Sequence, residues 1–297
     1  MNQERYNKLI EQEARHWGSA FGGQRDPENP QLWHDDRLFE IFFGKEYRHF
    51  LDRIVKAGLQ VLELGCGEGR LSIQLAERGK NLTAIDLSPE RIARARELAR
   101  NLSNPPAFMV GDLNTISLPS EQYDCVVAHD ALHHVLALDN LLDEVHKSLR
   151  LGGKLIIMDF VGMGRARKFL AALLYALLPT YKPYRQKWHL RKRFASFLAS
   201  EEEKRQALQQ KEGSPLLHSD SPFEEISQQS IVISVKRRFV LIDEYTFNPF
   251  WYYLAPKLLL PKSMRYDVAH LLRTMDNLIV NLGLSKGAYV FLEAKKL

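Results

Sequence analysis

Three glycines spaced two residues apart follow a short apolar run early in this chain of 297 residues. The run Val61–Leu64 predicts a buried strand, the glycines are Gly65, Gly67 and Gly69, and a helical pattern starts directly after them. Glycine at such a turn allows left-handed backbone and lets a ligand approach without meeting a Cβ atom. The spacing differs from the Gly-x-Gly-x-x-Gly of dinucleotide-binding proteins. The turn therefore predicts a strand–turn–helix unit of an α/β domain that binds another kind of ligand.

From residue 60 to residue 159, short apolar runs alternate with helical patterns. The runs are Val61–Leu64, Leu82–Ile85, Phe108–Val110, Cys125–Ala128 and Lys154–Met158, and the helical patterns are Arg70–Arg78, Pro89–Asn101 and Asn140–Arg150. Apolar strands with helices between them are typical of a parallel sheet that is covered on both faces. We therefore expect an α/β fold here.

The alternation stops after residue 159, and the pattern divides the chain into four parts. These are an N-terminal helical cover (1–57), a ligand-binding core (58–159), a mostly helical basic insertion (160–234) and the final strands and helices of the same domain (235–297). The expected helices of the insertion are Arg165–Leu178, Lys187–Glu212 and a short one after Ser221-Pro222, and the last part holds strands at Phe239–Phe247 and Ala288–Ala294 around a mostly helical stretch, Trp251–Leu282. Insertions after the carboxyl ends of strands carry substrate contacts in α/β proteins, so 160–234 is predicted to be a substrate lid.

The composition is that of a globular protein, with 45% hydrophobic and 26% charged residues, and it excludes a disordered or fibrous chain. The two cysteines, Cys66 and Cys125, form neither a disulfide framework nor a metal site alone, so we expect small buried residues and no metal. The N-terminus lacks the apolar core of a signal peptide, and the longest apolar run, Phe169 to Leu178, is far shorter than the about 20 residues that span a bilayer. We expect a soluble, cytoplasmic protein.

Two carboxylates lie near the glycine turn. Glu63 comes directly before the glycines, where it would repel a pyrophosphate but would suit a ligand end that carries an ammonium group. Asp86 ends the next strand, near the about 20-residue offset of an acidic residue that binds ribose hydroxyls. S-adenosylmethionine has a ribose, an amino acid end and no phosphate, and therefore matches this pair.

The block from about 60 to 159 resembles the class I S-adenosylmethionine-dependent methyltransferases, and within them the branch of ubiquinone and menaquinone biosynthesis. Five segments carry the resemblance in order: Glu63-Leu64-Gly65-Cys66-Gly67-Glu68-Gly69, Ile85-Asp86-Leu87-Ser88, Gly111-Asp112-Leu113, the stretch from Tyr123 to Val135, and Leu149 to Leu155. They cover about a third of the chain. The resemblance implies a Rossmann-like seven-stranded sheet, mostly parallel with an antiparallel last strand, to which the helical substrate insertion is added.

The resemblance also implies how the cofactor is held. The implied contacts are Glu63, Gly65, Cys66, Gly67, Gly69, Asp86, Leu87, Asp112, Leu113 and His129. Backbone of the glycine turn would pack against the cofactor, Glu63 would orient its methionine end, and His129 would border the methyl group. Asp86 would hold both ribose hydroxyls and Asp112 would accept a hydrogen bond from the adenine amino group. Leu87 and Leu113 would lie against the adenine ring.

His133 and His134 follow the fourth strand and are candidate catalytic residues. One of them could be a general base, because the pKa of imidazole is near neutral. Alternatively, one packs at a helix start while the other lines the cofactor wall. Methyl transfer needs little acid–base help, because the sulfonium is a strong electrophile and alignment supplies most of the rate.

Asn104-Pro105-Pro106 looks like the motif of amino-group methyltransferases but precedes the third strand, so an adenine or glutamine nitrogen is a less favoured acceptor.

The stretch from Phe160 to Ser200 holds nine basic residues and no acidic one. The basic residues are Arg165, Arg167, Lys168, Lys182, Arg185, Lys187, Arg191, Lys192 and Arg193. The stretch has three interpretations. The apolar face of Phe169, Leu170, Leu173, Leu174 and Leu177 could lie in a membrane interface, Tyr181, Tyr184 and Trp188 could stack on nucleic acid bases, or the segment is a packed lid with a solvated basic face. A second apolar and aromatic stretch, Phe250 to Lys262, favours the first of these.

Taken together, these features predict an S-adenosylmethionine-dependent methyltransferase for a small-molecule or lipid-linked acceptor, methylated on oxygen, nitrogen or carbon, with S-adenosylhomocysteine as the product. Peripheral membrane contact through 160–200 is expected, and nucleic acid is a disfavoured partner. The alternatives are an RNA methyltransferase that uses the basic insertion, and a non-catalytic cofactor-binding regulator. The oligomeric state is left open.

Overall fold

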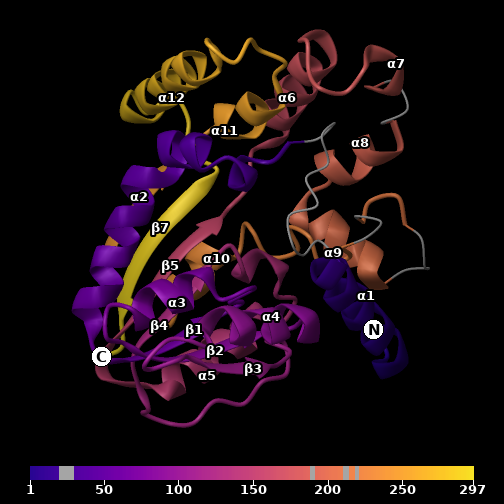
Figure 1. Cartoon of the computed structure of the whole chain (residues 1–297). Helices are drawn as coiled ribbons and strands as arrows, with labels where there is room; N and C mark the ends of the chain where they lie inside the picture. Colours follow the sequence, from indigo (N-terminus) through magenta and orange to yellow (C-terminus); the bar gives the residue numbers. More distant parts are fainter. Residues whose placement is uncertain (20–29, 188–190, 210–213, 218–220) are drawn as a thin grey trace.

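The computed structural model describes residues 1–19, 30–187, 191–209, 214–217 and 221–297, with backbone alone at 34 and 191–194. Its centre is a seven-stranded sheet in the order β3-β2-β1-β4-β5-β7-β6 (Figure 1). The strands are β1 Gln60–Leu64, β2 Asn81–Asp86, β3 Ala107–Val110, β4 Tyr123–His129, β5 Leu149–Phe160, β6 Val240–Phe247 and β7 Tyr289–Lys295. Strands β1 to β5 pair in parallel, whereas β7 runs antiparallel to β5 and β6. The expected seven-stranded Rossmann-like sheet is confirmed.

The helices surround this sheet and extend beyond one end of it (Figure 1). The α-helices are α1 Gln3–Ser19, α2 Asp36–Ala57, α3 Arg70–Ala76, α4 Pro89–Ala99, α5 Leu138–Ser148, α6 Arg165–Leu177, α7 Tyr184–Lys187, α8 Arg191–Leu198, α9 Glu201–Gln209, α10 Ile231–Lys236, α11 Trp251–Leu254 and α12 Arg265–Asn281, and the 3₁₀ turns are η2 Leu32–His34, η3 Leu132–His134 and η5 Ala255–Lys257. No helix within the described ranges combines the length and the apolar character needed to cross a bilayer.

Alternate strand residues point to opposite faces of the sheet, as the period of two requires. Val61, Val127 and Ile156 pack with α2 and α3 on one face. Leu62 and Val126 pack with α5 and α10 on the other. Central strands such as β1 and β4 are buried on both sides, so their sequences are mainly apolar runs, and this is why the runs predicted these strands.

The two N-terminal helices lie in different places. Helix α2 packs on the sheet through fully buried side chains such as Phe42 and Phe50. Helix α1 lies beside α4 and α9 (Figure 1). There Tyr6 and Leu9 pack against Phe223 of the insertion. Helix α1 therefore joins the insertion to the edge of the sheet that carries the glycine turn.

Two helix predictions in the insertion are wrong. The expected helix Lys187–Glu212 is divided, because Ser200 begins a new helix, α9. The Ser200 hydroxyl accepts from the N–H of Glu203 at 3.3 Å, and the Glu203 carboxylate accepts from the N–H of Ser200 at 2.8 Å. This reciprocal pair is a capping box, which starts a helix. The short helix expected after Ser221-Pro222 is a series of turns, and α10 begins only at Ile231.

Candidate functional site

The glycine turn is held in a left-handed conformation against the end of β2. Gly65, Gly67 and Gly69 have φ angles of 71°, 54° and 79°, where a side chain would be strained. The N–H groups of Gly65 and Cys66 both donate to the carbonyl oxygen of Ile85, at 2.8 and 3.0 Å. The turn after β1 is therefore fixed beside the end of β2.

Two of the glycines have different surroundings. A Cβ atom on Gly65 would lie 2.4 Å from the Cβ of Ala131, which follows β4. A Cβ atom on Gly67 would meet only the guanidinium of Arg91, at 3.4 Å. Gly65 is therefore required by packing within the protein, whereas Gly67 leaves space beside the turn in which a ligand can approach the backbone.

Asp86 lies directly beside the glycine turn. Its buried carboxylate accepts hydrogen bonds from the N–H of Gly67 at 2.8 Å and from the N–H of Ser88 at 2.9 Å. Its carbonyl oxygen accepts from the N–H of Gly111 at 2.9 Å, which brings the loop after β3 to the same place. Each carboxylate oxygen has a second lone pair. The predicted ribose-binding group is therefore oriented by the backbone and can still accept hydrogen bonds from hydroxyl groups.

Glu63, the last carboxylate before the turn, is buried and accepts a hydrogen bond from the hydroxyl of Ser72. Burial, together with the nearby charge of Asp86, raises the pKa of Glu63 to about 8. The Glu63 carboxyl therefore holds a proton near neutral pH. An ammonium group placed beside it would favour the ionised form and lower this pKa.

Asp112 is tied to helix α1, which the sequence did not predict. One of its oxygens accepts from the hydroxyl of Tyr6, and the other accepts from the backbone and side-chain amides of Asn114, both at 2.9 Å. Burial, followed by the hydrogen bond to Asp112, raises the pKa of Tyr6, so its hydroxyl keeps the proton that it donates. The predicted adenine contact is thus covered by α1, and Leu87 and Leu113 are half-buried at the same edge.

His129 ends β4 on the face that α2 covers. Its ring lies 5.5 Å from the ring of Tyr47 and 5.8 Å from that of Phe50. Burial lowers the pKa of His129 to about 4, so the ring is neutral at physiological pH. Its Nε2 atom has no hydrogen-bond partner among the described residues.

His133 lies on η3 and is oriented by a carboxylate at the end of β5. Its Nδ1 atom is 2.6 Å from Oδ1 of Asp159. The other oxygen of Asp159 accepts from the N–H groups of Ala131 and Leu132, at 3.0 and 2.7 Å. Burial would raise the pKa of Asp159, but the interaction with His133 and these amide donors outweigh it and lower that pKa. Asp159 therefore fixes both the loop after β4 and the direction of the His133 ring.

His134 lies beside a different carboxylate, with which it makes an ion-pair contact. Its Nδ1 atom is 3.2 Å from Oε1 of Glu13, on α1. Its Nε2 atom is 3.7 Å from Oε2 of Glu224, and Nε2 of His133 is 4.0 Å from Oε1 of the same residue. We call these residues, with Asp130 beside His133, the histidine–carboxylate cluster: Glu13, Asp130, His133, His134, Asp159 and Glu224.

The cluster holds more acidic groups than basic ones. Burial lowers the basicity of His134, but Glu224 and Glu13 outweigh it and raise its pKa to about 9. Burial and then Asp159 raise the pKa of Asp130 to about 8. Both pKa values are raised, in part because several carboxyl groups crowd around two imidazoles.

Helix α1 also covers the glycine turn through a contact between its Trp17 and Arg91 of α4. The Arg91 Nε donates to the carbonyl oxygen of Trp17 at 2.8 Å, and its guanidinium lies 4.9 Å from the centre of that indole ring. The indole Nε1 of Trp17 donates to Glu13 at 2.8 Å. Trp17, Arg91 and Glu13 were not predicted as site residues. The i, i+4 spacing of Glu13 and Trp17 places them on one helix face, but it does not say what that face covers.

Of the predicted site residues, the structure brings Glu63, the glycine turn, Asp86 and Asp112 to the carboxyl ends of β1, β2 and β3, and places His133 and His134 on a separate segment after β4. The cysteines are free and buried, and burial raises the pKa of both thiols, which keeps them protonated. Asp159 directly follows an apolar run, and this position could have identified it as a site residue from the sequence. No sequence pattern identifies Glu224 as a site residue, because only the fold brings it to the two histidines.

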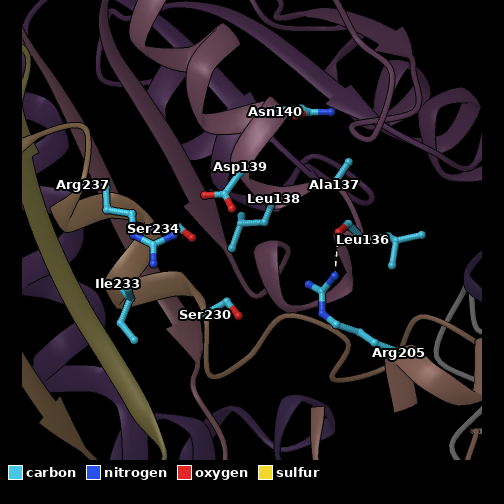
Figure 2. Close-up of a pocket in the computed structure, with 10 residues that line it drawn as sticks. All are labelled: Leu136, Ala137, Leu138, Asp139, Asn140, Arg205, Ser230, Ile233, Ser234 and Arg237. Atoms are coloured by element: carbon cyan, nitrogen blue, oxygen red, sulfur yellow. Dashed lines mark hydrogen bonds between the residues drawn. The ribbon is translucent and has the colours of Figure 1, made fainter. Parts of the chain in front are cut away.

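A cavity of about 390 Å³ lies elsewhere, between the loop after η3, the start of α5, α10 and Arg205 of α9 (Figure 2). Its lining includes Asp139, Ser230 and Arg237. Figure 2 shows Arg205 donating to the carbonyl oxygen of Leu136, at 3.1 Å. None of the predicted cofactor residues lines this cavity, so it is distinct from the candidate site.

Comparisons with known proteins agree with the geometry. Residues 62–157 match the family described as a methyltransferase domain. An uncharacterized methyltransferase of Mycobacterium tuberculosis is 34% identical over 116 residues, which cover 39% of this chain and 58% of that protein. The sterol 24-C-methyltransferase of Saccharomyces cerevisiae is 28% identical over 165 residues, which cover 52% of this chain and 40% of that protein. The chain thus spans less than two thirds of the length of each relative.

The fold extends beyond the matched residues. The crystal structure of the [4+2]-cyclase SpnF superposes with a TM-score of 0.53 at 16% identity, over 98% of this chain and 94% of that one. At this identity the likeness concerns the fold alone. The comparisons show similarity to methyltransferase domains over residues 62–157 and to a Rossmann-like fold over nearly the whole chain, and the branch of ubiquinone and menaquinone biosynthesis stays a prediction.

Proposed function

We propose that this chain binds S-adenosylmethionine at the glycine turn and transfers its methyl group to a small-molecule or lipid-linked acceptor. The observation that carries the proposal is the place of Asp86: a buried carboxylate, oriented by the N–H of Gly67, beside backbone that is open to a ligand. An S-adenosyl group fits these residues, because its ribose hydroxyls match a carboxylate acceptor and it brings no phosphate close to Glu63.

The chain's own residues would act mainly by binding and alignment. Asp86 would hold the ribose, Asp112 the adenine amino group, and Glu63 the ammonium of the methionine end, with Gly65, Cys66, Gly67 and Gly69 as the backbone floor and Leu87, Leu113 and His129 as the walls. Bound S-adenosylmethionine supplies an electrophilic methyl group. Helix α1 would exclude water from the site, because Tyr6 and Trp17 join it to both sides of the turn. We keep His133 and His134 as the acceptor-side residues.

The acceptor class is supported by exposed apolar side chains at one end of the molecule. On α6, Phe169, Leu170, Leu173 and Leu177 are 57%, 45%, 44% and 64% exposed. These positions lie on one helical face and match the predicted interfacial stripe, except for Leu174, which packs against the core. Exposed apolar patches of this kind mark lipid or partner surfaces. The sterol 24-C-methyltransferase relative agrees with a lipid-like acceptor.

A second apolar stripe lies on a nearby helix. Helix α12 exposes Leu271, Met275 and Leu278, and Leu282 directly follows the helix; these side chains are 60%, 42%, 56% and 62% exposed. Helices α6, α11 and α12 lie next to one another beyond the sheet (Figure 1), and α11 contacts both of the others. We propose that the two stripes rest on a membrane surface from which the acceptor is taken.

The nucleic acid interpretation loses support, because much of the basic stretch is engaged inside the protein. Arg165 pairs with Glu203 and Lys168 pairs with Glu225. Lys187 is buried and donates to a backbone carbonyl. Trp188 and the side chains of Arg191, Lys192 and Arg193 lie outside the described residues. Of the nine basic side chains, Lys182 and Arg185 are those in the described part of the chain with neither an ion pair nor a side-chain hydrogen bond, because Arg167 and Lys187 donate to backbone carbonyls.

Calorimetry with S-adenosylhomocysteine tests the cofactor site. Asp86→Ala should lower the affinity about ten- to a hundredfold, because it removes charge-assisted hydrogen bonds of about 1.5–3 kcal/mol. Asp267→Ala, at an exposed position of α12, is the matched control and should bind normally. Unchanged binding by Asp86→Ala, or equal binding of NAD by the wild type, would refute the site.

The reaction is tested by adding labelled S-adenosylmethionine and the protein to a denatured cell extract. Label in the lipid or small-molecule fraction supports the proposed acceptor class. Label in RNA would replace it with the RNA methyltransferase, and label in no fraction would favour the cofactor-binding regulator.

A further inference from the structure

Both adjacent histidines of the cluster hold Nδ1 against a buried carboxylate and turn Nε2 toward one shared carboxylate. The distances from Glu224 are 4.0 Å to Nε2 of His133 and 3.7 Å to Nε2 of His134. We propose that His133, His134 and Glu224 bind a divalent transition-metal ion of the Zn²⁺ type on the acceptor side of the site. This role replaces the general-base interpretation of the two histidines.

The distances suit such an ion. With bonds of about 2.0–2.1 Å and tetrahedral angles, neighbouring ligand atoms lie about 3.3 Å apart. The two separations from Glu224 exceed this value by less than 1 Å, and the ligand atoms of His133, His134 and Glu224 all lie within 4.8 Å of one another. Small side-chain rotations are therefore enough to bring the three ligand atoms to bonding distance of one ion.

The outer contacts are those that metal-binding histidines use. A ligating histidine usually donates its second ring N–H to a carboxylate, which fixes the tautomer and the direction of the ring. Asp159 occupies this position for His133, and Glu13 lies 3.2 Å from Nδ1 of His134 as an ion-pair partner. Ser221 and the N–H of Phe223 in turn donate to Glu13. The two Nε2 atoms are therefore directed by contacts from three separate parts of the chain.

The charge of the cluster also favours a cation. Four carboxylates, those of Glu13, Asp130, Asp159 and Glu224, surround two imidazoles. The buried Oδ1 atom of Asp130 has no hydrogen-bond partner among the described residues. A bound cation would favour the ionised form of these carboxyl groups and offset the cost of burying their charge. Two nitrogen ligands and one carboxylate favour Zn²⁺ or Co²⁺ over Mg²⁺ and Ca²⁺, which prefer oxygen ligands.

The ion would keep an open position. Three protein ligands leave one of four tetrahedral positions free, as in catalytic rather than structural zinc sites. The side chain of Glu224 is 30% exposed, so a path from solvent exists. An oxygen atom of the acceptor would fill the open position. This last step rests on the proposed function, whereas ion binding itself does not.

The experiment uses the full chain after treatment with a chelator. Zn²⁺ binding is measured by calorimetry, and visible absorption of added Co²⁺ reports nitrogen ligation in a four- or five-coordinate site. The wild type should bind one equivalent. Glu224→Gln and His134→Gln should each weaken binding at least about tenfold, and Glu13→Gln, which changes an outer contact, should weaken it about ten- to a hundredfold. His270→Gln, at an exposed position of α12, is the matched control.

S-adenosylhomocysteine binding and thermal melting are measured on the same samples. Retained cofactor binding with lost metal binding in Glu224→Gln supports the site, and it shows that the variant is folded. A wild type that binds no stoichiometric Zn²⁺ or Co²⁺, or Glu224→Gln and His134→Gln variants with unchanged affinity, would overturn the proposal. Neither result would contradict the cofactor site, because S-adenosylhomocysteine binding tests that site independently.

Discussion

The hydroxyl of Tyr6 donates a hydrogen bond to the carboxylate of Asp112, which joins α1 to the loop after β3. The two residues are 106 positions apart in sequence, so the contact exists only in the folded chain. The same carboxylate is the predicted acceptor for the adenine amino group. The Asp112 side chain is therefore expected to serve both the docking of α1 and the binding of the cofactor.

We expect Tyr6→Phe and Asp112→Ala to differ. Tyr6→Phe should loosen α1, because a hydrogen bond to a charged group is lost, while it leaves the affinity for S-adenosylhomocysteine within about threefold of the wild type. Asp112→Ala should loosen α1 and also lower that affinity about tenfold. Calorimetry and hydrogen exchange of α1 measure the two effects. If Tyr6→Phe weakens binding as much as Asp112→Ala, the carboxylate is not the adenine contact.

Alanine at Gly65 should be much more harmful than alanine at Gly79. Both glycines have left-handed backbone, with φ angles of 71° and 78°, so both variants carry a strain of about 1–2 kcal/mol. Only at Gly65 does the added Cβ clash, 2.4 Å from the Cβ of Ala131, whereas nothing lies within 4 Å at Gly79. Crowding should cost Gly65→Ala a further about 1–3 kcal/mol. Urea denaturation of the two variants measures the difference, and equal losses would contradict the packing argument.

Glu225 should stabilise the insertion in a pH-dependent manner. Its carboxylate lies 2.7 Å from the ammonium of Lys168 and 3.0 Å from that of Lys204, and both lysines are buried. Burial would raise the pKa of Glu225, but the two lysines outweigh it and lower the pKa to about 2. Between pH 4.5 and 2 the unfolded chain binds the proton more readily, so this stabilisation is complete above pH 4.5 and is lost as the pH falls toward 2.

Glu225→Gln should therefore lower the free energy of unfolding by about 3 kcal/mol at neutral pH, because two buried ammonium groups lose their counter-charge. The variant should also show a smaller loss of stability between pH 4.5 and 2 than the wild type. Denaturant titrations at several pH values measure both effects. Glu40→Gln, which breaks the exposed pair with Arg48, is the control and should change little. Equal effects of the two variants would show that Glu225 is not a buried anchor.

The apolar stripes should bind anionic vesicles. The wild type is expected to co-sediment with vesicles that contain phosphatidylserine more than with phosphatidylcholine alone, and increasing salt should weaken the binding without abolishing it. Replacing Leu271 and Leu278 of α12 by glutamine should reduce binding at least about tenfold, because each removes about 1.5–3 kcal/mol of apolar burial. Leu59 and Leu151, 50% and 78% exposed elsewhere, give the control pair.

Lys262 and Lys286, both exposed near the ends of α12, contribute the electrostatic part. Their replacement by glutamine should weaken binding to anionic vesicles only, by up to about 1 kcal/mol for each charge. Absence of co-sedimentation at low salt would refute the membrane surface. A stable dimer that the leucine variants dissociate would instead identify the stripes as an interface between two copies of the chain.

Residues that act locally were predictable from the sequence. Gly65, Gly67 and Gly69 lie between an apolar run and a helical pattern, and Asp86 follows the next run, because in a parallel sheet the ends of neighbouring strands meet at one edge. The central strands are buried on both faces, so their burial is visible as apolar runs such as Cys125–Ala128. The start of α9 at Ser200 was predictable as well, since Ser200 and Glu203 have the spacing of a capping box.

The sheet, the glycine turn and the carboxylates beside it were thus predictable from the sequence, because they depend on residues close together in the chain. The segments that cover them are visible only in the tertiary structure. It placed Tyr6 on Asp112 and Glu13 on His134, and brought Glu224 to the two histidines. It also turned Lys168 inward to Glu225, so that part of the basic stretch is buried rather than presented to a partner. Such contacts join segments far apart in sequence, and they form only because helices bury apolar faces whose partners no local pattern specifies.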